Sequence, residues 1–228
     1  MITILNLPAT GIIITVGLFL LGTWVYRKAR TPLLHPVVVA GTGVILLILF
    51  TPLDTEAYLK GGSMITFFLG PATVSLAVPL YRKRELLKRH WAIILGSVTM
   101  GCITSLGSVL ILGRILNIPD DLIYTLMPKS ITTPMAIELV AEHGLPALTA
   151  VAVIITGIIG AMIGPLVLRV LRIDHPVARG LAMGTAAHAI GTSKALEMGE
   201  EEGAIGGLAI GLAGIITVIL FPLFLGLL

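Results

Sequence analysis

The sequence predicts an all-α integral membrane protein: a polytopic helical bundle with about six or seven spans, one or two re-entrant broken-helix segments and a candidate inverted repeat. Three observations predict this class. The mean hydropathy is +1.04. Of the 228 residues, 56% are hydrophobic and only 12% are charged, which is far outside the composition of soluble domains. The basic residues also gather in short segments between apolar runs, as the positive-inside rule expects.

Composition also argues against several function classes. The net charge of +3 comes from those short basic segments, so we expect no nucleic acid partner. The five histidines are scattered, and the single cysteine, Cys102, lies in an apolar run with no histidine nearby. The sequence therefore predicts neither a metal site nor an intrachain disulfide. It contains no nucleotide-binding glycine loop and no nucleophile motif, and we expect no cofactor and no enzymatic activity.

Residues 1–61 are expected to form a two-span N-terminal scaffold. The first apolar run, 12–25, has no basic flank before it and no small-residue cleavage pattern, so it predicts a retained span rather than a signal peptide. Basic residues at 27–30 follow and place the N-terminus outside the cell. The second span covers 33–50 and ends before Pro52, where a helix cannot continue.

The next two spans carry the strongest orientation signal. Residues 62–81 are expected to form a third span, which Pro71 and Pro79 interrupt because proline breaks the helical hydrogen bonding. A basic cluster at 82–89 follows and predicts the cytoplasmic side. A fourth span, 91–113, then runs outward.

Residues 128–134, with the sequence Pro-Lys-Ser-Ile-Thr-Thr-Pro, form a polar break between apolar arms. The two prolines interrupt any helix that runs through them. The arms, 122–127 and 135–140, are too short to cross a hydrocarbon core of about 30 Å, which takes about 20 helical residues. The next run, 145–168, ends in basic residues and should run inward, so the segment must return to the outer side. We predict a re-entrant segment, and the alternative is a solvent loop between spans.

A second irregular segment, 180–199, precedes the last span, 203–228. The sequence leaves open whether this segment dips into the membrane and returns or crosses it, and therefore on which side the C-terminus lies. Glycines recur every fourth residue in the spans that flank the segment, and this pattern predicts close helix contacts. The predicted helix-packing residues are Gly160, Gly164, Gly203, Gly207 and Gly211.

A weak internal repeat accompanies this pattern. A shift of 57 residues pairs Pro71 with Pro128, and the spans it pairs run in opposite directions by the charge rule. Transporters use such inverted repeats to bring broken helices together near the membrane midplane. After the scaffold, the expected parts of this single transmembrane domain are two repeat halves, 62–119 and 120–176, and a polar segment with the last span, 177–228.

Two lysines fall inside the interrupted segments. An ionisable group at the membrane centre costs about 2.5 to 3.5 kcal/mol on insertion scales, so it normally faces a cavity or a partner. Lys129 and Lys194 are therefore candidate ligands for an anion. Alternatively, Lys129 extends to the interface or pairs with Glu138, and Lys194 pairs with Glu197.

Hydroxyls and one histidine complete the candidate site. Half-helices that begin at these breaks would offer free backbone amides to an anion, and His188 could carry a proton. Alternatively, the hydroxyls bond to their own backbone and the histidine is a neutral structural residue. The predicted substrate-binding residues are Pro71, Thr73, Ser75, Lys129, Ser130, Thr132, Thr133, Pro134, His188, Thr192, Ser193 and Lys194.

Three sequence blocks occur in order along the chain: LGPATVSLAVPLY at 69–81, PKSITTPM at 128–135, and GTAAHAIGTSKA at 184–195 with EEEG at 200–203. They resemble the signature blocks of the LrgB/CidB family of bacterial inner-membrane proteins, and the resemblance covers essentially the whole chain. The C-terminal half of the plastid glycolate/glycerate translocator is similar as well.

The resemblance implies two functions. Family members are described as antiholin-like or holin-like regulators of murein hydrolase activity and autolysis, working with a small LrgA/CidA-type membrane partner. Others are linked to uptake or exchange of small monocarboxylates such as pyruvate, glycolate and glycerate. We expect a monocarboxylate carrier in the bacterial inner membrane, and the alternative is a lysis regulator that moves no substrate. The expected partners are membrane lipid, a small carboxylate anion, an LrgA/CidA-type protein and a second copy of the chain.

Overall fold

The computed structural model describes residues 7–227 except 30, 32, 33, 69, 70, 72, 73, 75–77, 79, 80, 82 and 83. The described residues form helices and short connections, with no β-strand among them. The chain divides into two compact units, Met1–Ala72 and Thr73–Leu228.

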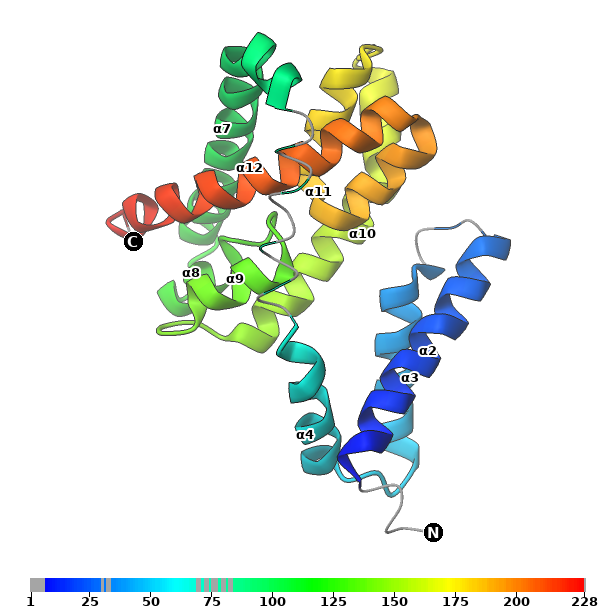
Figure 1. Ribbon diagram of the computed structural model, residues 1–228. Helices are drawn as coiled ribbons and strands as arrows, with labels where there is room; N and C mark the ends of the chain where they lie inside the picture. Colours follow the sequence, from blue (N-terminus) through cyan, green and yellow to red (C-terminus); the bar gives the residue numbers. More distant parts are fainter. Residues whose placement is uncertain are drawn as a thin grey trace. The chain divides into compact units, whose positions relative to one another are not determined.

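The first unit contains α2 (Pro8–Ala29), α3 (Pro36–Phe50) and α4 (Thr55–Thr66). Helix α2 packs against both of the others, and Figure 1 shows α2 and α3 side by side. His35 caps α3, because its Nδ1 accepts a hydrogen bond from the Val37 amide at 3.4 Å. The hydroxyls of Thr15 and Tyr58 lie 2.8 Å apart and join α2 to α4.

Among its described residues, the second unit contains three long helices: α7 (Arg84–Ile115), α10 (Pro146–Val170) and α12 (Glu200–Leu225). It also contains two short helices, α8 (Asp120–Leu126) and α9 (Thr133–Val140), and the kinked helix α11 (Pro176–Met198). Helix α11 packs against α7, α10 and α12. Figure 1 shows α8 and α9 as a short pair beside α10.

The structure supports the predicted class, a helical membrane protein. Within the described part of the chain, four helices are long and apolar enough to cross a membrane: Ala9–Ala29, Trp91–Ile115, Pro146–Val170 and Glu200–Leu225. The finer expectation of about six or seven spans is not confirmed. Helix α3 has 15 residues and α4 ends at Thr66, and much of the rest of the expected third span, 62–81, lies outside the described residues.

Helices α8 and α9 form a hairpin, called the first hairpin below, with its tip at 127–132. The Tyr124 hydroxyl donates to the Leu139 carbonyl at 2.9 Å, and the Leu145 amide donates to the Thr125 hydroxyl at 3.1 Å. The chain therefore enters and returns at the same end. The arms of 7 and 8 residues rise only about 12 Å at about 1.5 Å per residue, which matches the short arms and the reversal expected around the prolines.

Helix α11 is a second hairpin, although it carries neither proline nor glycine at its tip. Helical geometry fails at Ala187 (φ −131°, ψ 19°) and His188 (φ 41°, ψ −133°). Beyond that point the chain folds back, because a Cβ on Gly191 would overlap the backbone oxygen of Met183. In a straight helix, residues eight positions apart are separated by about 12 Å. The segment therefore folds back on itself, and whether it re-enters the membrane stays a prediction.

Helix α12 packs against both arms of this second hairpin. A Cβ on Gly184 in the first arm would overlap the backbone oxygen of Gly206. A Cβ on Gly203 would lie 2.7 Å from the Cα of Leu196 in the second arm. The first arm is thus parallel to α12 and the second is antiparallel. Glycine is required at these positions because the helix backbones are almost in contact.

Candidate functional site

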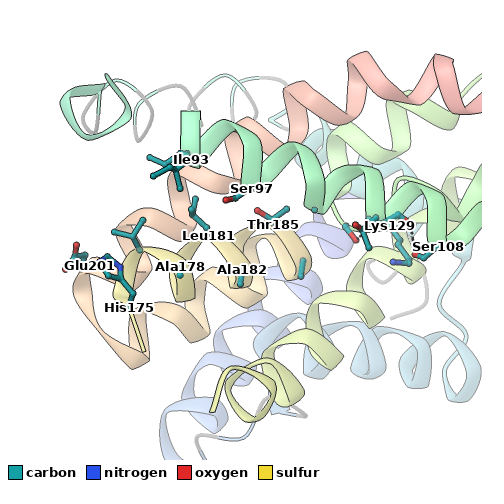
Figure 2. Close-up of a pocket in the computed structure, with 17 residues that line it drawn as sticks. Ile93, Ser97, Ser108, Lys129, His175, Ala178, Leu181, Ala182, Thr185 and Glu201 are labelled. Carbon is teal, nitrogen blue, oxygen red and sulfur yellow. Dashed lines mark hydrogen bonds between the residues drawn. The ribbon is translucent and has the colours of Figure 1, made fainter. Parts of the chain in front are cut away.

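A cavity of about 1000 Å³ lies between α7 and the first arm of the second hairpin, and the tip of the first hairpin forms one end of it. Figure 2 shows its length, with His175 and Glu201 at one end and Lys129 and Ser108 at the other. From α7 it is lined by Ile93, Ile94, Ser97, Gly101, Thr104, Ser105 and Ser108; from α11 and the residues beside it by His175, Val177, Ala178, Leu181, Ala182, Thr185, Ala186 and Glu201; and from the first hairpin by Lys129 and Ser130.

Lys129 is the charged group at the inner end of this cavity. Among the described residues, no carboxylate lies within ion-pair distance of its ammonium group. Lys129 is half-buried, and an anion beside its ammonium group would offset the cost of taking that charge out of water.

Hydroxyl groups surround Lys129. The side-chain oxygens of Ser105 and Ser130 lie 2.8 Å apart, so one hydroxyl donates to the other and the second retains a proton for another acceptor. The Thr185 hydroxyl is buried and has no hydrogen-bond partner, which is costly unless a ligand or water supplies one. Lysine is also a pure donor. The inner end therefore offers hydrogen-bond donors and positive charge, a set that fits an anion.

The tip of the first hairpin lies near the first arm of the second hairpin just beyond this end. A second cavity of only about 10 Å³ is lined by Pro128 and Ser130 from the first tip, by Thr185 from the second hairpin, and by residues of α7 and α12 that include Ala213. Ser105 and Ala213 lie near the middle of the membrane-length segments Trp91–Ile115 and Glu200–Leu225. A space this small barely admits one water molecule, so the cavity narrows almost completely at this end.

His188 holds the tip of the second hairpin against α10. Its Nε2 lies 2.8 Å from the Val153 carbonyl oxygen, and the side chain is 4% exposed. The imidazole fits there because position 157 is glycine: a Cβ on Gly157 would lie 2.6 Å from Cε1 and 2.8 Å from Nε2 of His188. A positive φ at a residue other than glycine costs about 1 to 3 kcal/mol unless the surroundings enforce it. The contacts of His188 with Val153 and Gly157 help to hold it in this conformation.

The cavity gathers only part of the predicted substrate-binding set. Lys129 and Ser130 line it, whereas Lys194 pairs with Glu197 at 2.8 Å, the alternative considered for that lysine. The remaining predicted residues that the structure describes do not line the cavity. Pro71 is exposed, Thr132, Thr133 and Pro134 lie at the start of α9, and His188 contacts α10. Thr192 faces Gly206, the Ser193 hydroxyl donates to the Ala189 carbonyl of its own helix, and Thr73 and Ser75 lie outside the described residues. Their roles stay predictions.

Sequence reasoning missed the hydroxyl stripe of α7 and Thr185 of α11. The stripe consists of Ser97, Gly101, Thr104, Ser105 and Ser108, all lining the cavity. The signal was available, because these small or hydroxylated residues recur every three to four positions and therefore share one helix face. Thr185 lies within the third signature block, but only its geometry sets it apart from Thr192 there.

The predicted glycine positions lie mostly at helix contacts. A Cβ on Gly160 would overlap that of Ala187, and one on Gly164 would lie 2.5 Å from the Met183 sulfur, so both face α11. Gly203 faces Leu196, as described above. Gly211 is buried and Gly207 is half-buried. Gly180 and Gly184, which the predicted set omits, face α12.

A family model described as the LrgB-like family matches residues 15–227. The chain belongs to the LrgB-like family. Proteins named antiholin-like protein LrgB from Bacillus mycoides (strain KBAB4), Bacillus cereus (strain B4264) and Bacillus anthracis (strain CDC 684 / NRRL 3495) are each 34% identical over 220 residues, which is 96% of this chain and 96% of theirs. No solved structure matches the chain.

Membership in the LrgB-like family agrees with the resemblance found in the sequence blocks. The match to the family covers the six described helices of the second unit and the lining of the cavity. Within the described residues, no group of three or more histidine, cysteine, aspartate or glutamate side chains could hold a metal ion. The inner end of the cavity offers hydroxyl groups and the ammonium group of Lys129.

Proposed function

We propose that this LrgB-like chain is an antiholin-like protein of the bacterial cell membrane that restrains murein hydrolase activity and autolysis. The observation that carries the proposal is its 34% identity to antiholin-like LrgB proteins over 96% of both chains. Full-length coverage means that the whole chain, and not one shared module, has counterparts in those relatives. We further propose that it acts without enzymatic chemistry, as a homodimer, and with a small LrgA/CidA-type membrane protein.

A complementation experiment tests this function. The chain is expressed in a bacterium that lacks its own LrgB-type protein, with and without the LrgA/CidA-type partner, and autolysis is followed as loss of turbidity. We expect slower lysis and lower murein hydrolase activity when both proteins are present. Unchanged lysis at a verified membrane level of both proteins would contradict the antiholin-like function.

The geometry favours a second candidate function, that of a carrier for small carboxylates. The observation behind it is the ammonium group of Lys129, which has no carboxylate partner among the described residues and lies at the inner end of the cavity. A half-buried cation without such a partner is costly in a membrane protein, and a bound anion would offset that cost. Glycolate, glycerate and pyruvate are the ligands that we propose.

The donor set suggests how such a ligand would bind. The carboxylate accepts hydrogen bonds from Lys129 and from the hydroxyl proton that the Ser105 and Ser130 pair retains. The Thr185 hydroxyl, which is buried and has no hydrogen-bond partner among the described residues, is the group that we propose for the 2-hydroxy or keto oxygen. Broken helical segments around a binding site near the membrane midplane are also an architecture of transporters.

Flux through the purified protein tests the carrier function. Proteoliposomes are loaded with unlabelled glycolate, and uptake of labelled glycolate or pyruvate is measured with and without the LrgA/CidA-type partner. We expect saturable exchange that Lys129→Met reduces at least about tenfold, since a charge-assisted hydrogen bond contributes about 1.5 to 3 kcal/mol. Lys194→Gln is the matched control and should retain uptake. Equal uptake by the Lys129→Met variant and the unmodified protein would remove Lys129 from the site.

A further inference from the structure

The cavity follows one face of α7 over much of the membrane. Its α7 lining begins at Ile93 and ends at Ser108, a distance of about 22 Å at about 1.5 Å per residue. Along this face the side chains change from isoleucine near the start of the helix to hydroxyls and glycine further in. The polar part of the cavity therefore lies next to its inner end, where Lys129 is.

The opposite wall is the first arm of the second hairpin, and it is lined by small residues. Ala178, Ala182 and Ala186 face the cavity at intervals of four residues, as expected for one helix face. This arm is parallel to α7, because a Cβ on Gly101 would lie 2.7 Å from Cγ2 of Thr185 while His175 and Ile93 line the other end of the cavity. Alanine on this wall leaves room for a solute between the two helices.

The two ends of the cavity differ in accessibility. At the end where α7 and α11 begin, His175 and Glu201 line the cavity and are exposed. At the inner end, Ser105 and Ser130 are in hydrogen-bond contact, and beyond them a space of only about 10 Å³ remains. A solute could therefore reach Lys129 from the first end but could not continue past the hairpin tips.

From these observations we infer that the groove between α7 and the first arm of α11 is a water-filled, one-sided access route, through which small hydrophilic anions reach Lys129. It opens on the side of the membrane where α7 and α11 begin. Arg84, Arg169 and Arg172 lie at that end of their helices, and the positive-inside rule identifies such an end as cytoplasmic. The identity of the ligand rests on the proposed carrier function, whereas the presence of water in the groove does not.

The competing explanation is that the hydroxyl face of α7 contacts lipid. Thr104 donates to the Met100 carbonyl at 2.8 Å and Ser108 donates to the Ser105 carbonyl at 2.8 Å, so both hydroxyls have the intrahelical bonds that make them tolerable in lipid. Lys129 has no such bond and argues for water. Measuring which α7 residues meet water separates the two explanations.

Thiol labelling provides that measurement, since Cys102 is the chain's single cysteine. In a Cys102→Ala background, single cysteines replace Ser97, Thr104 and Ser108 on the cavity face. Matched controls replace Met100, Ile103 and Ile111, which are 63%, 37% and 59% exposed but do not line the cavity. Each variant is treated with a membrane-impermeant thiol reagent in vesicles of both orientations. Only variants that migrate as one symmetric peak in detergent are compared.

We expect the three cavity positions to react at least about ten times faster than the three controls, and only from the side on which Arg84 lies. Equal rates at all six positions, or reaction from the opposite side, would overturn the route. Glycolate or pyruvate is then added during labelling of the Ser108→Cys variant. Protection by millimolar carboxylate supports the ligand class. Labelling without protection leaves the hydrated route in place and contradicts the carboxylate, so the two claims fail separately.

Discussion

The two hairpins of the second unit reverse the chain by different means. The first hairpin turns at a tip that two prolines bracket, and its arms are separate helices. The second turns within Ala-Ala-His, residues that normally continue a helix, and it is enforced by contacts with α10 and α12. One reversal is thus encoded locally, whereas the other depends on tertiary packing. Substitutions around the second hairpin should therefore have the larger effects.

The largest effect is expected where the second hairpin meets α12. Gly184→Ala places a methyl group against the Gly206 backbone, and backbone cannot move aside as a side chain can. We expect the free energy of unfolding to fall by about 3 kcal/mol or more, measured by denaturation in detergent. Gly96→Ala, whose Cβ meets nothing within 4 Å, is the control and should be neutral or stabilising, because alanine favours helix by about 0.5 to 1 kcal/mol. Similar losses in both variants would refute the close approach.

The next effect tests the backbone at His188. His188→Ala removes the hydrogen bond to Val153 but keeps a side chain at positive φ, so we expect a loss of about 2 kcal/mol. His188→Gly removes the same bond but adopts this conformation freely. The glycine variant should therefore be the more stable of the two by about 1 kcal/mol in the same denaturation experiment. The reverse order would show that the reversal at 188 carries no strain.

A smaller effect concerns the fit between Gly157 and the imidazole. Gly157→Ala should cost about 1 to 2 kcal/mol because its Cβ overlaps the His188 ring. In the His188→Ala background the ring is absent, and the same substitution should cost almost nothing. The coupling energy from this double-mutant cycle measures the contact directly. A Gly157→Ala penalty that persists without the imidazole would point to Ile190, the other side chain near that position.

The smallest effect is expected in the first hairpin. Pro134 occupies the first turn of α9, where proline lacks only an amide hydrogen that the helix does not use. Pro134→Ala should therefore lower the free energy of unfolding by only about 0.4 to 1 kcal/mol, through greater freedom of the unfolded chain. Thermal unfolding in detergent would detect the difference. A loss as large as that of Gly184→Ala would mean that the first hairpin depends on packing as much as the second.

The contrast between the hairpins also explains which parts of the fold could be predicted from sequence. Prolines act through covalent geometry, so the break and its short arms were predictable from residues 122–140, and the basic residues after the run 145–168 predicted the reversal. The second reversal was not, because nothing local distinguishes His188 from a helical residue and its partners Val153 and Gly157 lie far away in the chain. The expected number of spans is not confirmed: four membrane-length helices are found among the described residues, and much of the expected third span lies outside them.

The candidate site was predictable in part for the same reason. Lys129 and Ser130 lie in the proline-bracketed tip, where a polar break in an apolar chain is visible. Lys194 also stands out as a lysine in an interrupted apolar segment, but it pairs with Glu197 one turn away. The sequence could not show which of the two lysines would be paired. Thr185 and the hydroxyl face of α7 join the site only through the parallel packing of α7 and α11, which is tertiary information.

The second hairpin has a consequence for how the protein is made. Its 23 residues carry Arg179, Lys194 and Glu197, and α11 is not among the helices that could partition into lipid unaided. A nascent chain that ends at Met198 would therefore leave this segment at the membrane surface, outside the bilayer. Only when α12 emerges, with the glycines that receive both arms, can the insertion apparatus release a buried hairpin. The last helix to be synthesised would then insert first, and the segment before it would insert second.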